Sequence, residues 1–288
     1  MRLPRPQIRD CCVHVTQRCQ QREFLLKFAV DRQQYQRRLL QASRKFWRLR
    51  FLDYAITSNH VHLLLWVPRM SDLSEMMHWL QGSFARDYNI RKRREGAFWR
   101  GRFHPTLIQS GSHLSRCLFY LDMNMVRAGV VDHPFDWPHG GAQELCGARH
   151  RNRICDRARL LWCLGMPEQD EAFDDWYRAT LGQLCDQWTT APRREPYWSS
   201  AFAVGEAEWL NSIGGDIEDL TPYMEAAIKD GPETENAPKV LRLPQRIFLR
   251  LWKALNRKIH QSNKMVILSF GKVFLTSDKE WKVLDSNV

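Results

Sequence analysis

The segment from His60 to Val67, which reads HVHLLLWV, constrains the fold of this chain most. Side chains alternate between the two faces of a strand, so His60 and His62 point the same way while Val61 points to the opposite face. The apolar run that follows predicts a buried strand, and Ser58-Asn59 before it indicates a tight turn from a preceding strand over residues 47–57. The sequence therefore predicts a hairpin whose second strand begins with two imidazoles side by side.

Two adjacent imidazoles make half of a metal site. Neutral imidazole suits divalent metals, and one or two further oxygen or nitrogen ligands would leave positions open for substrate and water. A His-x-His pair is also common in strands that bind nothing. Tyr120 and Asn124 strengthen the metal interpretation, because residues four apart share one face of the helix expected from Ser112 onward. A tyrosine hydroxyl beside such a metal can attack a phosphodiester, and Asn124 can supply an oxygen ligand to the same ion.

The rest of the N-terminal half alternates between strand and helix signals. Alternating, β-branched residues predict a strand over 12–16, followed by a polar turn over 17–23. His14 either faces the site or stands at a strand end, and the strand end is favoured. Helical spacing predicts a basic amphipathic helix over 31–46 and a second helix over 71–88 with Ser71 as its N-cap. A further strand is expected over 103–108.

The charge of the chain favours a polyanionic partner. The formal net charge is +11 and the pI about 9.5, and residues 1–50 hold 13 Arg and Lys against 3 Asp and Glu. Arginine pairs bidentately with phosphate, which favours nucleic acid over a merely solvated surface. Between residues 91 and 103 basic residues alternate with Phe98 and Trp99, whose rings could stack on unpaired bases, although an exposed hairpin tip would look similar. The predicted DNA-binding residues are Arg2, Arg5, Arg9, Arg18, Arg22, Arg91, Lys92, Arg93, Arg94, Trp99, Arg100, Arg102 and Arg127.

The eight cysteines are scattered without a C-x-x-C pair, so neither a zinc ribbon nor a disulfide framework is indicated. They are typical of reduced thiols in the cytoplasm. The N-terminus lacks an apolar core segment, and no run approaches 18 apolar residues. We expect a cytoplasmic, nucleoid-associated protein.

Four motifs together resemble a known family, the REP-associated tyrosine transposases of the single-tyrosine HUH endonuclease superfamily (IS200-like transposases). The motifs are His14-Val-Thr-Gln-Arg18 with Arg22-Glu-Phe24, Asn59-His-Val-His-Leu-Leu64, Gly96-Ala-Phe-Trp-Arg-Gly-Arg-Phe103 and Tyr120-Leu-Asp-Met-Asn-Met-Val-Arg-Ala-Gly-Val-Val131. Two departures are Met125, where the family usually has proline, and Cys19, where glycine is common. Neither position is a metal ligand or the nucleophile.

The resemblance implies an α+β nuclease domain, ferredoxin-like, with helices packed against an antiparallel sheet. It implies that His60 and His62 hold Mg²⁺ or Mn²⁺, that Asn124 matches the third metal-coordinating position, and that Tyr120 forms a 5′-phosphotyrosine intermediate and a free 3′-OH. The implied substrate is single-stranded or hairpin DNA of repetitive extragenic palindromes. Two alternatives remain, namely a hairpin-binding protein that does not cut and a structural zinc protein. A monomer is favoured over a homodimer.

The C-terminal half carries weaker signals. Pro and Gly near residue 140 predict the end of the nuclease domain at 1–140, followed by a helical region over 141–215. Residues 216–238 are acidic and polar and predict a linker. Residues 239–260 predict a basic amphipathic helix, and residues 261–288 match no known pattern, so the role of 239–288 is unassigned.

Overall fold

The computed structural model describes residues 9–147, 149–167, 172–190, 196–199, 201–206 and 209, and the strand segments 239–240, 266–269, 272–277 and 280–285. The chain divides into two compact units. One comprises Gln7–Pro105 and Ser110–Glu195, and the other comprises Met1–Pro6, Thr106–Gln109 and Pro196–Val288. Residues 141–195 therefore belong to the same compact unit as residues 7–105 and 110–140 of the predicted nuclease domain, and the predicted domain boundary near 140 stays a prediction.

Three antiparallel strands form the sheet of the first unit. They are β1 (Arg9–Arg18), β2 (Arg50–Ile56) and β3 (His60–Arg69), with β3 paired to both of the others. The hairpin predicted around Ser58-Asn59 is the β2–β3 connection. A register shift between Phe51 and Asp53 interrupts the β2–β3 ladder. The strands are buried on both faces, which explains the nearly continuous apolar run after His62.

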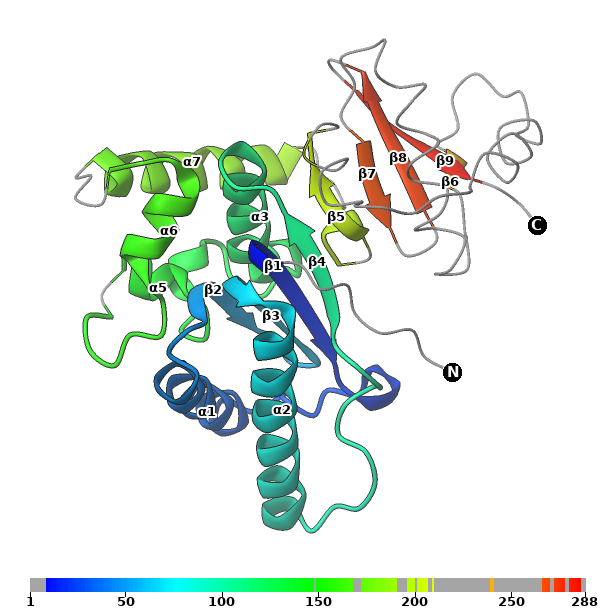
Figure 1. Cartoon of the computed structure of the whole chain (residues 1–288). Coiled ribbons are helices and arrows are strands. Elements are labelled where there is room, and N and C mark those ends of the chain that lie inside the picture. Colours follow the sequence, from blue (N-terminus) through cyan, green and yellow to red (C-terminus); the bar gives the residue numbers. More distant parts are fainter. Residues whose placement is uncertain are drawn as a thin grey trace. The chain divides into compact units, whose positions relative to one another are not determined.

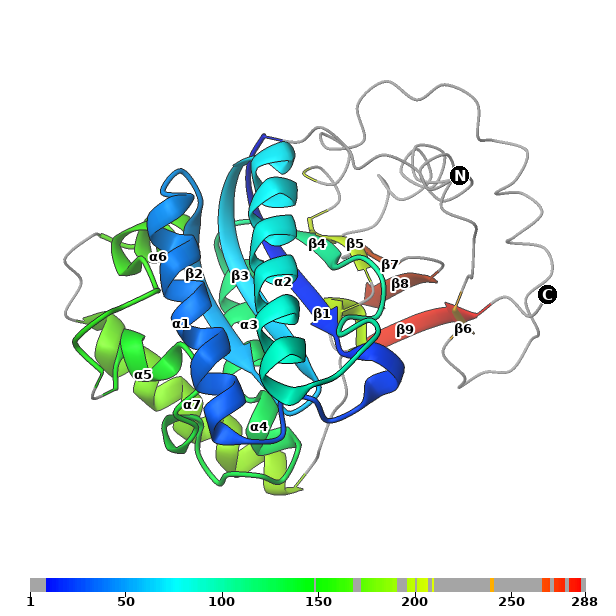
Figure 2. The ribbon, with the colours of Figure 1, turned by 90° about the horizontal axis from the view of Figure 1, so that it is seen from below.

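Helices cover both faces of this sheet, giving three layers (Figures 1 and 2). The helices α1 (Ala29–Lys45) and α2 (Met70–Lys92) lie on one face, and α3 (Ser112–Asp122) with α6 (Arg157–Leu164) lies on the other. The shorter elements of this unit are η1 (Gln20–Arg22), α4 (Asn124–Arg127), η2 (Pro134–Asp136) and α5 (Ala142–Leu145), and the long helix α7 (Ala172–Thr190) packs beyond α3. This architecture confirms the predicted α+β class.

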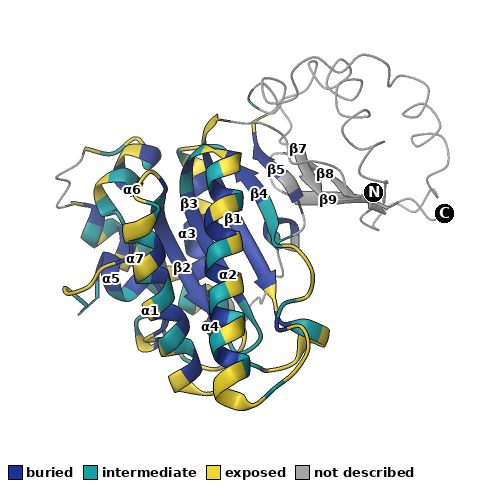
Figure 3. Ribbon diagram, turned by 60° about the horizontal axis from the view of Figure 1, so that its bottom comes forward, coloured by how far each residue is buried: buried dark blue, intermediate teal, exposed yellow. Residues whose placement is uncertain are grey.

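The core lies between the layers, and the exposed residues follow the outer faces of the helices (Figure 3). An aromatic cluster joins α1 and α2, where the Tyr35 and Phe84 rings lie 4.9 Å apart and Phe98 packs 5.3 Å from Phe84. Gln81 donates from its side-chain amide to the Tyr35 hydroxyl at 3.0 Å. The apolar side chains of α2, from Leu73 to Phe84, are therefore part of the core.

Three local predictions were wrong. The N-cap of α2 is Arg69 and not Ser71, since the helix begins at Met70 directly after β3. The expected turn over 17–23 starts later, because Gln17 and Arg18 still pair with β3. Tyr120 and Asn124 do not lie on one continuous helix, because α3, which carries Tyr120, ends at Asp122. Met123, with ψ near 0°, separates α3 from α4.

The second unit contains strands from distant parts of the sequence. The end of β4 (His104–Ile108) pairs in parallel with β5 (Ala201–Gly205), which follows η3 (Pro196–Ser199). Antiparallel pairing continues through β7 (Val266–Ser269), β8 (Lys272–Ser277) and β9 (Glu280–Asp285), and β6 (Lys239–Val240) pairs in parallel with β9.

The last 50 residues therefore contain strands that the sequence did not predict. Lys239 and Val240 are extended, so the predicted basic helix was wrong at its first two residues. Residues 241–260 of that helix, and the predicted linker over 216–238, lie outside the described residues. Within the part of the chain that is described, no helix has both the length and the apolar character needed to cross a membrane.

Candidate active site

One face of the β1–β3 pair gathers five polar side chains. In the β1–β3 register Thr16 lies opposite His62, and Arg18 lies opposite His60. His14 lies opposite Leu64 and therefore diagonally from His62 on the same face. Directly paired residues share a face, so alternation along both strands places all five on the side of the sheet that α3 covers. His14, Thr16 and His62 are buried.

His62 has a partner at each ring nitrogen. Its Nδ1 lies 2.8 Å from Nε2 of His14 and 3.3 Å from the Thr16 hydroxyl, and the two imidazole rings are stacked with centroids 5.0 Å apart. Its Nε2 lies 3.2 Å from the side-chain amide of Asn124. The third position that the sequence predicted therefore meets the histidine pair.

His60 is held by the turn that precedes it. Its Nδ1 lies 2.7 Å from the side-chain oxygen of Asn59 and 2.9 Å from the hydroxyl of Thr57. Because Nδ1 can donate its proton to the Asn59 oxygen, Nε2 keeps a lone pair. The His60 ring centroid is 4.7 Å from that of His62, so the two imidazoles lie side by side on one face, as the alternation predicted.

Both histidines are held in the neutral form. Burial, followed by the electrostatic effects of Arg18, His14 and Arg127, lowers the pKa of His60 to about 3. Burial, together with His60, His14, Arg127 and Arg18, lowers the pKa of His62 well below its usual value. Neutral imidazole is the form that binds a metal.

Tyr120 approaches the histidines from the last turn of α3. Its ring centroid lies 6.2 Å from the rings of both His14 and His62. The Arg127 guanidinium lies over the tyrosine ring, 4.0 Å from its centroid. The helix break at Met123 does not separate Tyr120 from Asn124, because the following turn, α4, carries both Asn124 and Arg127 on the same side.

The donor set fits a hard or borderline divalent ion. Among the described residues, no group of three or more His, Cys, Asp or Glu side chains could hold a metal. A metal here would use two imidazoles and the Asn124 amide oxygen after rotation of that amide. All eight cysteines are free thiols.

The predicted basic residues fall into two groups. The first group is a cluster beside the site that consists of Arg18, Arg22 and Arg100. The Arg100 backbone N–H donates to the Arg18 carbonyl at 2.8 Å. Burial, followed by the nearby charges of Arg22 and Arg100, lowers the pKa of Arg18. In contrast, Arg91 and Lys92 pair with buried Asp31 at 2.5 and 3.4 Å.

The other basic residues differ in their surroundings. Arg94 pairs with Glu23 at 3.6 Å and donates to the Ala97 carbonyl at 3.1 Å. Arg9, Arg93 and Arg102 are exposed, whereas Arg2 and Arg5 lie outside the described residues.

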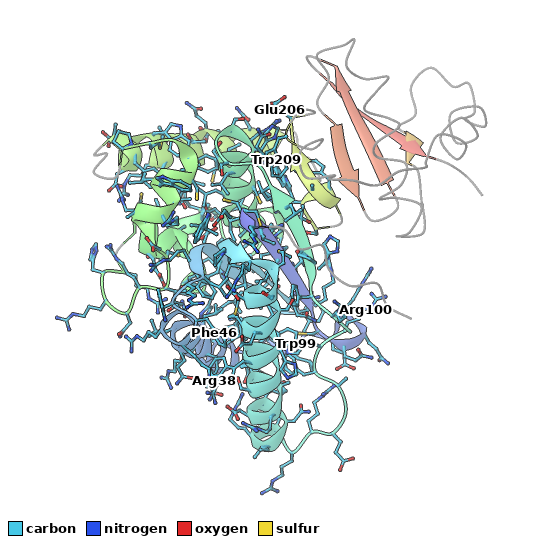
Figure 4. All side chains as sticks on the ribbon, viewed as in Figure 1. Arg38, Phe46, Trp99, Arg100, Glu206 and Trp209 are labelled. Carbon is cyan, nitrogen blue, oxygen red and sulfur yellow. The ribbon has the colours of Figure 1, made fainter. Side chains whose placement is uncertain are left out.

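Phe98 and Trp99 differ from the sequence-based expectation. Phe98 is buried in the aromatic cluster, so it is unable to stack on a base. Trp99 is partly exposed, and its indole N–H donates to the Gln81 carbonyl at 3.1 Å (Figure 4). A DNA contact by Trp99 stays a prediction. Figure 4 shows Arg100 further out than Trp99.

Sequence reasoning missed two contributors to the site. The preferred placement of His14 at a strand end was wrong, because His14 lies in the middle of β1. Its alternation with Cys12 and Thr16 signals a shared face, but only the register to β3 shows which face. Asn59, the second contributor, was read as a turn residue, and the structure adds a hydrogen bond to His60.

Part of the chain is similar in sequence to known proteins. Residues 7–121 match the family described as "Transposase IS200 like". A Haemophilus influenzae protein named "Putative REP-associated tyrosine transposase" is 31% identical over 94 residues, which cover 29% of this chain and 53% of the relative. The chain thus spans about half the length of that relative.

A solved structure of a REP-associated tyrosine transposase bound to a REP hairpin is 18% identical, covering 56% of this chain and 93% of that one with a TM-score of 0.43. The family match covers the strands that carry His14, His60 and His62 and the helix that carries Tyr120. Residues 7–121 are therefore similar to the IS200-like transposases over both the strands and the helix that form the site.

Proposed function

We propose that this protein is a metal-dependent endonuclease and strand transferase that acts on single-stranded DNA at hairpin-forming repeats, with Tyr120 as its nucleophile. The observation that carries the proposal is the convergence of Tyr120 from α3 with His62 from β3, with ring centroids 6.2 Å apart. Nearly sixty residues separate them in sequence. Ordinary core packing would not require two neutral histidines, a tyrosine and an arginine at one place.

His60, His62 and Asn124 would hold Mg²⁺ or Mn²⁺. The bound ion would supply Lewis-acid stabilisation of the charge that develops on the scissile phosphate and its leaving oxygen. The chain prepares this set by keeping both imidazoles neutral and by fixing Nδ1 of each through a hydrogen bond.

Tyr120 would attack the phosphorus, forming a bond from its phenolic oxygen while the bond to O3′ of the preceding nucleotide breaks. The phenol loses its proton and the leaving O3′ gains one, which gives a 5′-phosphotyrosine and a free 3′-OH. One phosphate ester replaces another, so a second 3′-OH can reverse the step and join a new strand. Arg127 lies over the Tyr120 ring, where the contact between the guanidinium and the ring face orients the tyrosine.

The cluster Arg18, Arg22 and Arg100 would bind the phosphates that flank the scissile bond. It adjoins the site because Arg18 lies opposite His60. Hairpin DNA as the substrate is supported by the sequence motifs, and the name of the Haemophilus influenzae relative calls that protein REP-associated. We also infer that the protein works as a monomer in the cytoplasm, and a solution mass near twice 34.1 kDa would contradict the monomer.

The test uses labelled single-stranded hairpin DNA with flanks, incubated with protein and Mn²⁺ and resolved on a denaturing gel. The expected result is a covalent protein–DNA adduct that disappears in Tyr120→Phe and persists in Tyr88→Phe, a buried tyrosine of the aromatic cluster. Tight binding without any adduct would instead support a hairpin-binding protein that does not cut.

The metal residues are tested separately. His60→Ala and His62→Ala should each abolish cleavage and leave hairpin binding nearly intact, because affinity for DNA comes mainly from basic side chains. Asn124→Ala should weaken the metal dependence less. Equal loss of binding and cleavage in the histidine variants would mean that the histidines support the fold, and an unchanged metal dependence would remove Asn124 from the site.

A further inference from the structure

His14 is a buried polar residue at the centre of β1 whose role goes beyond the residues proposed above. Its side chain is fully inaccessible to solvent, and its neighbours Val13 and Val15 point to the other face of the sheet. Its Nε2 lies 2.8 Å from Nδ1 of His62. A buried imidazole without a hydrogen bond would be costly, so this contact restricts where the proton of each ring can lie.

A hydrogen bond between two neutral imidazoles has two possible directions. If His62 donates from Nδ1, its Nε2 keeps a lone pair, and the proton of His14 lies on its Nδ1. If His14 donates from Nε2, the proton of His62 lies on Nε2, which is then unable to ligate a metal. The direction of this one bond therefore decides whether His62 can act as a ligand through Nε2.

The surroundings of His62 favour the first direction. The Thr16 hydroxyl, 3.3 Å from Nδ1 of His62, can accept from the same N–H. The Asn124 amide nitrogen, 3.2 Å from Nε2, can donate to a lone pair there. The stacking of the two rings, inclined by 20° to each other, keeps the geometry in place.

We propose that His14 is a positioning residue that accepts a hydrogen bond from Nδ1 of His62 and so holds His62 in the tautomer with a free lone pair on Nε2. Metal-ligating histidines usually donate their second N–H to a fixed acceptor, and removing that acceptor typically costs about 10–100-fold in metal affinity. The link to metal rests on the proposed function, but the tautomer itself does not.

The first measurement is the ¹⁵N NMR tautomer of His62 in the metal-free protein, assigned with His62→Asn. We expect the proton on Nδ1 in the wild type and in His14→Gln, whose side-chain carbonyl can still accept. In His14→Leu, which has no acceptor, the population with the proton on Nε2 should rise. A wild-type His62 with its proton on Nε2 would refute the proposal.

The second measurement is the affinity for Mn²⁺ alone, by electron paramagnetic resonance of the free ion. His14→Leu should bind about 10–100-fold more weakly than the wild type, and His14→Gln should recover most of that affinity. His139→Leu serves as the matched control, because His139 is a buried histidine that packs on Trp137 and lies outside the site.

The outcomes separate the two proposals. Wild-type affinity in His14→Leu, or an equal decrease in His139→Leu, would show that His14 only fills space. If the wild type bound no Mn²⁺ and cut no DNA, the proposed function would fail, whereas the tautomer of His62 in the wild type and in His14→Leu would still decide the role of His14.

Discussion

Arg127 offers the sharpest test of the role proposed for Tyr120. Its guanidinium lies 4.0 Å from the centroid of the Tyr120 ring, in the turn that follows the break in the tyrosine helix. The same side chain carries a positive charge that lowers the pKa of His60 and His62. Arg127→Leu removes the cation and its stacking on the ring together, and Arg127→Lys keeps the charge but lacks the planar fork.

The expected decrease in rate follows from two contributions. A cation over an aromatic ring contributes about 0.5–2 kcal/mol. A hydrogen bond to a charged group, here the phosphate, contributes about 1.5–3 kcal/mol. Together they amount to about 2–5 kcal/mol, which at 1.36 kcal/mol per tenfold corresponds to a cleavage rate lower by about 30-fold to several thousand-fold. Arg127→Lys should slow cleavage less than Arg127→Leu.

The assay is single-turnover cleavage of a saturating labelled hairpin in Mn²⁺, so that binding does not limit the rate. Binding is measured in parallel by fluorescence anisotropy, and Arg116→Leu, an exposed arginine on α3, is the control. If Arg127→Leu cut within threefold of the wild-type rate, Arg127 would have no part in the chemistry. If binding and cleavage decreased equally, Arg127 would only bind DNA.

Three further predictions concern charge, pH and packing. The double variant Arg18→Gln and Arg100→Gln should reduce the slope of log affinity against log salt concentration by about 0.7 for each phosphate that is no longer neutralised. The control variant Arg37→Gln and Arg44→Gln, at two exposed positions on α1, should leave that slope unchanged. Burial raises the pKa of Asp122 to about 7. The folded state therefore keeps a proton that the unfolded state releases near pH 4, so the free energy of unfolding should fall as pH rises from about 4 to 7. Asp122→Asn, which can still accept from the Tyr177 hydroxyl, should reduce that fall in thermal melts between pH 5 and 8, and an unchanged profile would place the titration elsewhere. Phe98→Ala should lower the free energy of unfolding in urea by about 3–5 kcal/mol because the Phe98 side chain is buried in the core, and a decrease below about 1 kcal/mol would contradict that burial.

The sequence alone determined the elements and the chemistry that short-range patterns encode. Alternation of period two predicted that His60 and His62 share a face, and the turn before them predicted the hairpin. The spacing of Tyr120 and Asn124 predicted that both would face one site, although the helix between them is broken. These features depend on residues within a few positions of one another, so they can be read without knowing the rest of the fold.

The tertiary structure decided everything that depends on register or on which face a neighbour covers. His14 meets His62 only because β1 pairs with β3 in one register, and a slip of one residue would turn His14 to the opposite face. Phe98 and Trp99 are adjacent in sequence, yet one is core and the other partly exposed, because packing against α2 distinguishes them. Arg91 and Lys92 carry the same charge as Arg100, but the buried carboxylate of Asp31, sixty residues earlier in the chain, pairs with the first two. Composition gives the charge of a side chain, whereas only the folded chain determines which partner that charge meets.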